Sequence, residues 1–172
     1  MKTLIIATLG AWLMGSLAIA FVATQNFRAV ERVLRAASGQ PELARYIERL
    51  GAAEARTLLR HLASEMNRFY FQVWGWSQLF LALVVLVGLW GGGIHDRIAQ
   101  GLVLVMIAIV LVAVLYLTPE VMAIGRRLDF VPRDPPPPDF ARFRRLHAAY
   151  TLLDLVKLGM GAIVLFRLAR LP

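Results

Sequence analysis

Four stretches of this chain are apolar over about 20 residues, and no other feature constrains its fold as strongly. They are residues 3–24, 69–90, 98–117 and 147–166. A helix of this length crosses the ~30 Å hydrocarbon core of a bilayer. The composition agrees, with 59% hydrophobic and 17% charged residues. We therefore predict an all-α integral membrane protein, a four-transmembrane-helix bundle in one domain.

The first apolar stretch also invites comparison with a secretory signal. Lys2 precedes it, and residues 18–20 (AIA) have the small side chains of a cleavage site. The apolar part is longer than a typical signal core, so we expect it to remain as the first span. The chain has no cysteine, which excludes disulfides, thiolate metal ligands and a cysteine nucleophile.

Positive charge is distributed unevenly between the connections and predicts the topology. Residues 25–68 hold eight arginines and five glutamates, and residues 118–145 hold six arginines and four acids. The other side has only Lys2, Arg97, Arg167 and Arg170 as cations. The positive-inside rule places the rich connections in the cytoplasm and both termini outside. Topology thus explains the formal charge of +8, and we expect no nucleic-acid partner.

The cytoplasmic connection 25–68 has a helical pattern. Apolar residues at helical spacing continue the first helix through residues 27–37, and Gly39-Gln40-Pro41 interrupts it. Proline at a first helical position and Gly51 just past the end predict a short helix at 41–50. A long helix then runs from Ala52 into the second span. A proline-rich linker, 131–141, returns the chain to the fourth span.

Polar residues follow one face of the long helix where it approaches the membrane. His61, Glu65, Arg68 and Gln72 recur at helical spacing. Glu65 can pair with Arg68, and His61 can donate to Glu65. The predicted cytoplasmic polar stripe comprises His61, Glu65, Arg68, Gln72, Glu120 and Arg126. It is interpreted either as a solvated face with ordinary ion pairs or as a polar path leading into the membrane.

The fourth span carries ionisable groups that cost free energy in lipid unless they have polar partners. Each central Asp or Lys costs about 2.5–3.5 kcal/mol on insertion scales, so partners must compensate for them. Lys157 can reach back to Asp154, and Gln78 of the second span lies at a similar depth. The predicted intramembrane polar cluster comprises His147, Tyr150, Asp154, Lys157 and Gln78. Such a cluster either performs a function or fixes the helix register.

Several segments resemble a bacterial family of four-span proteins of unknown function. They are LGAWLMGSLAIAFVATQNFRAV, SEMNRFYFQVWGWSQL, YLTPEVMAIGRRLDF and FRRLHAAYTLLDLVKLGMG. That family is itself similar to the membrane domain of copper-resistance proteins. The resemblance implies an inner-membrane protein, and related proteins bind haem or handle copper through a histidine in the first span. The first span here, LIIATLGAWLMGSLAIAFVAT, has no histidine, which leaves His147 as the position to carry over.

Three classes of function remain. The first is a non-catalytic accessory or assembly subunit of a larger, energy-transducing membrane complex, with the bilayer and other membrane subunits as partners. The second is a haem- or copper-binding protein using His147 or His61. The third is a small transporter or proton relay using Asp154 and Lys157. No acid–base or nucleophile arrangement reaches the level of a motif, so we expect no enzyme activity, no catalytic residue, no resident cofactor and no metal site.

Overall fold

The computed structural model describes residues 1–132 and 134–171, and within these ranges every regular element is a helix. The predicted all-helical class is confirmed. In chain order the elements are α1 (Lys2–Ala36), a 3-10 turn η1 (Ala37–Gly39), α2 (Pro41–Leu50), α3 (Ala52–Gly91), α4 (Arg97–Val112), a π-helical segment η2 (Ala113–Leu117), α5 (Thr118–Leu128) and α6 (Asp139–Arg170).

Three helical stretches of the described residues are long and apolar enough to cross a membrane. They are Lys2–Gly39, Ala52–Gly91 and Arg97–Leu128, and they contain the first three predicted spans. The fourth predicted span, 147–166, lies within α6 and is not one of these three. The four-span count therefore stays a prediction.

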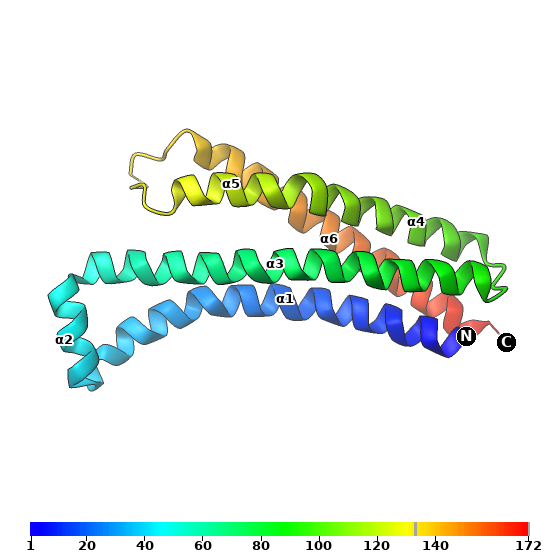
Figure 1. The fold of residues 1–172 in the computed structure, drawn as a ribbon, viewed down its shortest axis with the longest axis horizontal. Helices are drawn as coiled ribbons and strands as arrows, with labels where there is room; N and C mark the ends of the chain where they lie inside the picture. Colours follow the sequence, from blue (N-terminus) through cyan, green and yellow to red (C-terminus); the bar gives the residue numbers. More distant parts are fainter. Residues whose placement is uncertain (133, 172) are drawn as a thin grey trace.

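The helices lie roughly alongside one another, with the chain termini at one end of the molecule. Figure 1 shows α1 and α3 antiparallel over nearly their whole length, α4 and α5 in a continuous line beside them, and α6 crossing behind. The N- and C-termini meet at one end, and α2 lies at the other (Figure 1). We call the end opposite the termini the distal end.

The tip of the α1–α3 hairpin is built by proline and glycine. α2 begins at Pro41 and ends at Leu50, as the sequence predicts. Gly51 adopts φ 89°, which a residue with a Cβ rarely adopts, and so lets the chain turn sharply into α3. α6 begins at Asp139, so the last residues of the predicted proline-rich linker are helical.

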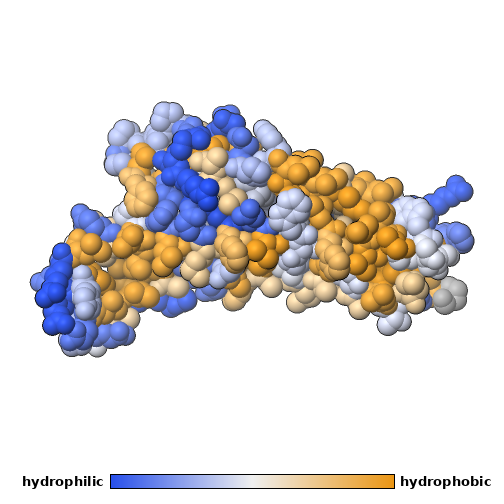
Figure 2. Space-filling model, viewed as in Figure 1, coloured by the Kyte–Doolittle hydropathy of each residue, from blue (hydrophilic) through white to orange (hydrophobic). Residues whose placement is uncertain are grey.

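The core lies in the half of the molecule near the termini. Its buried residues recur at helical spacing on four helices: Ile5, Leu9, Trp12, Ala82, Val85, Leu89, Ala99, Val103, Met106, Val110, Val164 and Leu168. Large apolar side chains also cover the outside of this half (Figure 2). Helices that are apolar both inside and outside the bundle suit a bilayer solvent.

Helices contact one another closely in the middle of the bundle, at Gly15, and near the termini, at Asp96. A methyl group added to Gly15 would lie 2.1 Å from the Trp74 ring, so α1 can approach α3 only with glycine there. Asp96 caps α4 by accepting from the backbone N–H groups of Ile98 and Ala99, each at 3.1 Å. Arg167 of α6 donates to the same carboxylate at 2.9 and 3.1 Å. These hydrogen bonds, that from Arg167 first, lower the pKa of Asp96.

The π-helical segment precedes Pro119. A proline in a helix clashes with the carbonyl four residues earlier, here Leu115, and donates no hydrogen bond. The wider turn of η2 accommodates this position, and the helix continues from α4 into α5 without a break.

Candidate functional site

A buried lysine joins three helices in the middle of the bundle. The Lys157 ammonium donates to Ser16 Oγ at 3.1 Å, to the side-chain oxygen of Gln78 and to Asp154. Lys157 is 1% exposed, and Gln78 and Ser16 are 2% and 3% exposed. Its three donors are therefore all used, on groups from α1, α3 and α6.

The same glutamine accepts a second hydrogen bond. The indole N–H of Trp12 donates to the Gln78 side-chain oxygen at 3.0 Å. Buried tryptophan usually finds such an acceptor. We call Trp12, Ser16, Gln78, Asp154 and Lys157 the lysine cluster. Of the residues predicted for this cluster, Gln78, Asp154 and Lys157 are together, and Trp12 and Ser16 of α1 were not foreseen.

The lysine cluster is a largely buried network. Its ionic pair is Lys157–Asp154, whose side chains are 2% and 23% exposed. Neither of the two cavities discussed below has any member of the cluster in its lining. What the arrangement can do chemically is hold α6 against α1 and α3 at one register, because each donor finds a fixed acceptor.

His147 and Tyr150 form no hydrogen bond with the lysine cluster within the described part of the chain, although Tyr150 lies one turn from Asp154 and within range of its charge. The Tyr150 ring meets Phe71 edge-on, with centroids 5.6 Å apart, and His147 stacks on Phe143 at 5.9 Å. Both line a cavity at the distal end rather than the lysine cluster. They share a helix face with Asp154 in sequence, but each turn toward the start of α6 carries them about 5 Å further from Lys157.

Near the distal end, charged residues from α3 and the end of α5 form a second network. Arg68 donates two hydrogen bonds, of 2.8 and 2.9 Å, to the Asp129 carboxylate, and both side chains are below 10% exposed. His61 Nδ1 lies 2.8 Å from the same carboxylate. Glu65 accepts from Arg68 at 2.5 Å and from Arg126 at 3.3 Å. We call His61, Glu65, Arg68, Arg126 and Asp129 the distal ion-pair network.

The network favours an ionised Asp129. Burial alone would raise the pKa of this carboxyl, but the hydrogen bonds from Arg68 and His61 outweigh burial and leave the pKa below its ordinary value. His61, Glu65 and Asp129 bring possible metal-ligand atoms within 4.8 Å of one another. Both carboxylates already accept from arginine, which neutralises the charge that a cation would need. The donor set therefore fits an ion-pair network better than a metal site.

The predicted polar stripe is only partly assembled. Glu65, Arg68 and Arg126 meet, but His61 pairs with Asp129 and not with Glu65 as predicted. The reason is that Asp129, 68 residues away in sequence, reaches the His61 ring at the end of α5. Glu120 instead pairs with Arg142 of α6 at 2.6 Å. Gln72 is exposed and does not line the cavity in which His147 and Tyr150 lie.

A cavity of about 670 Å³ opens between α3 and the α5–α6 hairpin. Both His61 and His147 line it. Arg68, Asp129 and Tyr150 line it as well. We call it the distal cavity. Sequence reasoning missed it, because it depends on how α5 diverges from α3, and no residue pattern encodes that angle.

Comparison with known proteins gives no matching family model, curated protein or solved structure. Inference about function therefore rests on the geometry of this chain.

Proposed function

We propose that this protein is a small, non-catalytic accessory or assembly subunit of a larger membrane complex. In this proposal α6 forms a fourth span, the bundle lies in the bacterial inner membrane, and both termini are periplasmic. The distal end is then cytoplasmic, in agreement with its arginine content. The resemblance to a bacterial four-span family remains a hypothesis beside it.

One observation carries the proposal: the tip of the α1–α3 hairpin presents apolar side chains that nothing covers. None of the ten residues of α2, all of which the structure describes, is buried. Tyr46 of α2 is 62% exposed, and Leu58 and Leu62 of α3 are 55% and 57% exposed. Figure 2 shows an apolar strip that continues along this hairpin toward α2. We call Tyr46, Leu50, Leu58 and Leu62 the tip surface.

Protein is a better partner for the tip surface than lipid. The helices that bind membrane surfaces carry excess Lys and Arg on their polar face. α2 has two glutamates and two arginines, so its charges balance. Leu58 lies 11 residues before the predicted second span, roughly 16 Å beyond its end at ~1.5 Å per residue. Exposed apolar side chains on the charge-balanced α2 and on a part of α3 held away from the bilayer suit a helix or groove of a partner protein.

The lysine cluster supports an architectural role over a proton relay. A relay needs groups that connect to water on both sides, and intramembrane charges normally line such a path. Lys157 is instead enclosed, and its partners are fixed. The cluster allows α6, which carries polar side chains, to pack against α1 and α3. A subunit with an architectural role requires such stable helix packing.

Purification of the full chain in mild detergent tests the proposal. We expect a membrane partner to co-purify in stoichiometric amount, and a photo-crosslinker placed at Leu58 or Leu62 to react with that same partner. The double variant Leu58→Glu/Leu62→Glu should no longer co-purify with this partner. Ala53→Glu, an exposed position on the opposite side of α3, is the matched control and should retain it. Recovery of the chain alone, with no crosslink from the tip surface, would overturn the proposal.

A haem-binding protein is the alternative that one observation favours, since His61 and His147 line the same cavity. The contacts of the two rings differ, however. His61 is engaged with Asp129 and Phe130, and exposed His147 stacks on Phe143. A visible absorption spectrum with metal analysis separates the alternatives. A Soret band that disappears in His147→Ala would replace the accessory-subunit proposal by the haem-binding one.

A further inference from the structure

The distal cavity lies where three predicted spans end. Phe71, Thr118 and Tyr150 line it, and these residues stand at or within a few residues of the ends of spans two, three and four. At the other extreme of the lining, Arg56 is 15 residues before Phe71 on α3. That separation is roughly 22 Å along the helix. The cavity thus extends from the expected membrane boundary toward the tip of the hairpin.

The two walls of the cavity differ in chemistry. The α3 wall is polar, with side chains at helical spacing: Thr57, Arg60, His61, Ser64, Asn67 and Arg68. The facing wall from α5, α6 and the loop between them is largely apolar: Val121, Met122, Leu128, Val131, Phe140 and Phe143. A volume of about 670 Å³ lies within the range of about 300–1,000 Å³ typical of small-molecule sites. The shape and lining suit an elongated molecule with one polar end.

Charge at the outer end of the cavity is positive and incompletely balanced. Arg56 and Arg60 share a single acid, Glu31 of α1, at 3.3 and 4.0 Å. Arg68 is already paired with Asp129 and Glu65, so it does not add an unpaired positive charge to this end of the cavity. The polar end of a ligand would therefore meet two arginines whose common counter-ion is one carboxylate.

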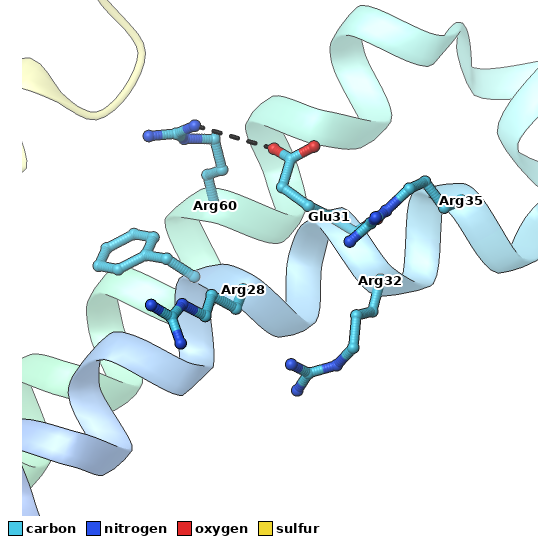
Figure 3. Close-up of a pocket in the computed structure, with 6 residues that line it drawn as sticks. Arg28, Glu31, Arg32, Arg35 and Arg60 are labelled. Carbon is cyan, nitrogen blue, oxygen red and sulfur yellow. Dashed lines mark hydrogen bonds and ion pairs between the residues drawn. The ribbon is translucent and has the colours of Figure 1, made fainter.

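A neighbouring hollow adds to this positive charge. It has a volume of about 480 Å³ and shares Phe27 and Arg60 with the distal cavity. Figure 3 shows Arg60 of α3 paired with Glu31, while Arg28, Arg32 and Arg35 line the same α1 segment. Arg28, Arg32 and Arg35 thus line the hollow together with Glu31, which pairs there with Arg60 and also with Arg56 of the distal cavity. Guanidinium groups grouped in this way bind carboxylate or phosphate.

We propose that the distal cavity binds a single-chain anionic amphiphile. Its carboxylate or phosphate accepts hydrogen bonds from Arg56 and Arg60, and its hydrocarbon chain lies along Val121, Met122 and Phe143 toward the membrane boundary. The volume suits one chain better than an entire two-chain lipid. This inference is independent of the accessory-subunit proposal, because the tip surface and the distal cavity consist of different residues.

Equilibrium binding to the full chain in phosphatidylcholine nanodiscs tests the inference, with empty nanodiscs as background. The probes are radiolabelled hexadecyl phosphate, hexadecanoate, hexadecanol and inorganic phosphate. We expect saturable binding of the first two and at least tenfold weaker binding of hexadecanol, which lacks the charge. Inorganic phosphate that binds as tightly as hexadecyl phosphate would show a plain anion site and overturn the inference.

Two variants and one control locate the ligand. Arg56→Gln/Arg60→Gln should weaken hexadecyl phosphate binding about tenfold or more and leave hexadecanol unchanged. Met122→Trp, which fills the apolar wall, should weaken both. Arg45→Gln/Arg49→Gln removes the same charge from α2, outside the cavity, and should change neither.

The remaining outcomes decide against the inference. Equal losses in the Arg56/Arg60 and Arg45/Arg49 variants would mean that net charge alone attracts the probe. Binding that never exceeds the empty-nanodisc background would also overturn the inference. A Soret band in the purified protein would do the same if the probe cannot displace the haem that causes it. Thermal unfolding of each variant in the same nanodiscs identifies any variant that fails to fold. If the Arg56→Gln/Arg60→Gln variant fails to fold, Arg60→Lys replaces it, because lysine keeps the charge but not the planar pair of donors.

Discussion

The lysine cluster and the distal ion-pair network both have a largely buried ion pair at their centre, yet they differ in the partners that each charged group has. In the first, one cation satisfies acceptors from three helices and is 1% exposed. In the second, two arginines and a histidine converge on two carboxylates, and Arg126 is 59% exposed. The first lies among predicted spans; the second lines a cavity. Loss of one cation therefore leaves Asp154 without its ion-pair partner Lys157, whereas Asp129 contacts both Arg68 and His61 and keeps one of the two.

Replacing the buried cation should have the largest effect. Lys157→Met leaves Asp154 without its cation, and breaking a buried pair costs about 3–5 kcal/mol. We expect the free energy of unfolding, measured by SDS titration in mixed micelles, to fall by that amount. Removing both charges in Lys157→Met/Asp154→Leu should restore most of it, since Gln78 still accepts from Trp12. A double variant as unstable as the single would show that the charges serve more than architecture.

A smaller loss is expected at the distal network. Arg68→Gln removes the paired hydrogen bonds to Asp129, but His61 still contacts Asp129 and Arg126 still donates to Glu65, so neither carboxylate loses every partner. Hydrogen bonds to charged groups contribute about 1.5–3 kcal/mol, and the same SDS titration should show a loss of this size, below that of Lys157→Met. If Arg68→Gln proved the more damaging of the two, this explanation by the remaining partners would fail.

Acid should weaken the distal network in part. The pKa of Asp129 is lower in the folded protein than its ordinary value, so its contribution is present above the unfolded pKa of about 3.9 and disappears as pH falls through the folded pKa. We expect the difference in unfolding free energy between wild type and Asp129→Asn to shrink below about pH 4. It stays smaller than the Arg68 effect, because Arg68 keeps Glu65. A difference for Asp129 that is constant with pH would contradict this explanation.

The smallest effect is expected at an exposed ion pair of the same region. Arg127 donates to Asp139 at 2.9 Å, with side chains 55% and 40% exposed. Exposed pairs contribute about 0–1 kcal/mol, so Arg127→Gln should change the unfolding free energy by no more than this. A loss above about 2 kcal/mol would mean that this pair is coupled to the distal network.

The sequence predicts local features of this fold well and distant contacts poorly. Helix limits near Pro41 and Gly51 follow from backbone chemistry, which acts within a few residues. The Lys157–Asp154 pair follows from helical spacing, since the partners lie one turn apart. Gln78 was also predicted, from its depth in the second span. The four-span count and the accessory function remain predictions.

Contacts between distant segments were harder to foresee. Ser16 of α1 meets Lys157 of α6 where these two helices pack closely, since a Cβ added to Gly161 of α6 would lie 2.4 Å from the Leu13 side chain. A small residue in an apolar span does not reveal which face it uses. Trp12 gave a signal that could have been used, since a mid-span indole N–H needs an acceptor. The pairing of His61 with Asp129 depends on where α5 ends after the π-helical segment, and helix periodicity carries no information on that.

α3 runs for 40 residues, Ala52–Gly91, and none of them is proline. It carries Leu62 of the tip surface, Arg68 of the distal network and Gln78 of the lysine cluster, over roughly 24 Å at ~1.5 Å per residue. The tip surface, the distal cavity and the lysine cluster therefore share one uninterrupted helix, which fixes their distances along the molecule. A position anywhere on α3 is thus tied to all three features by a single run of backbone hydrogen bonds.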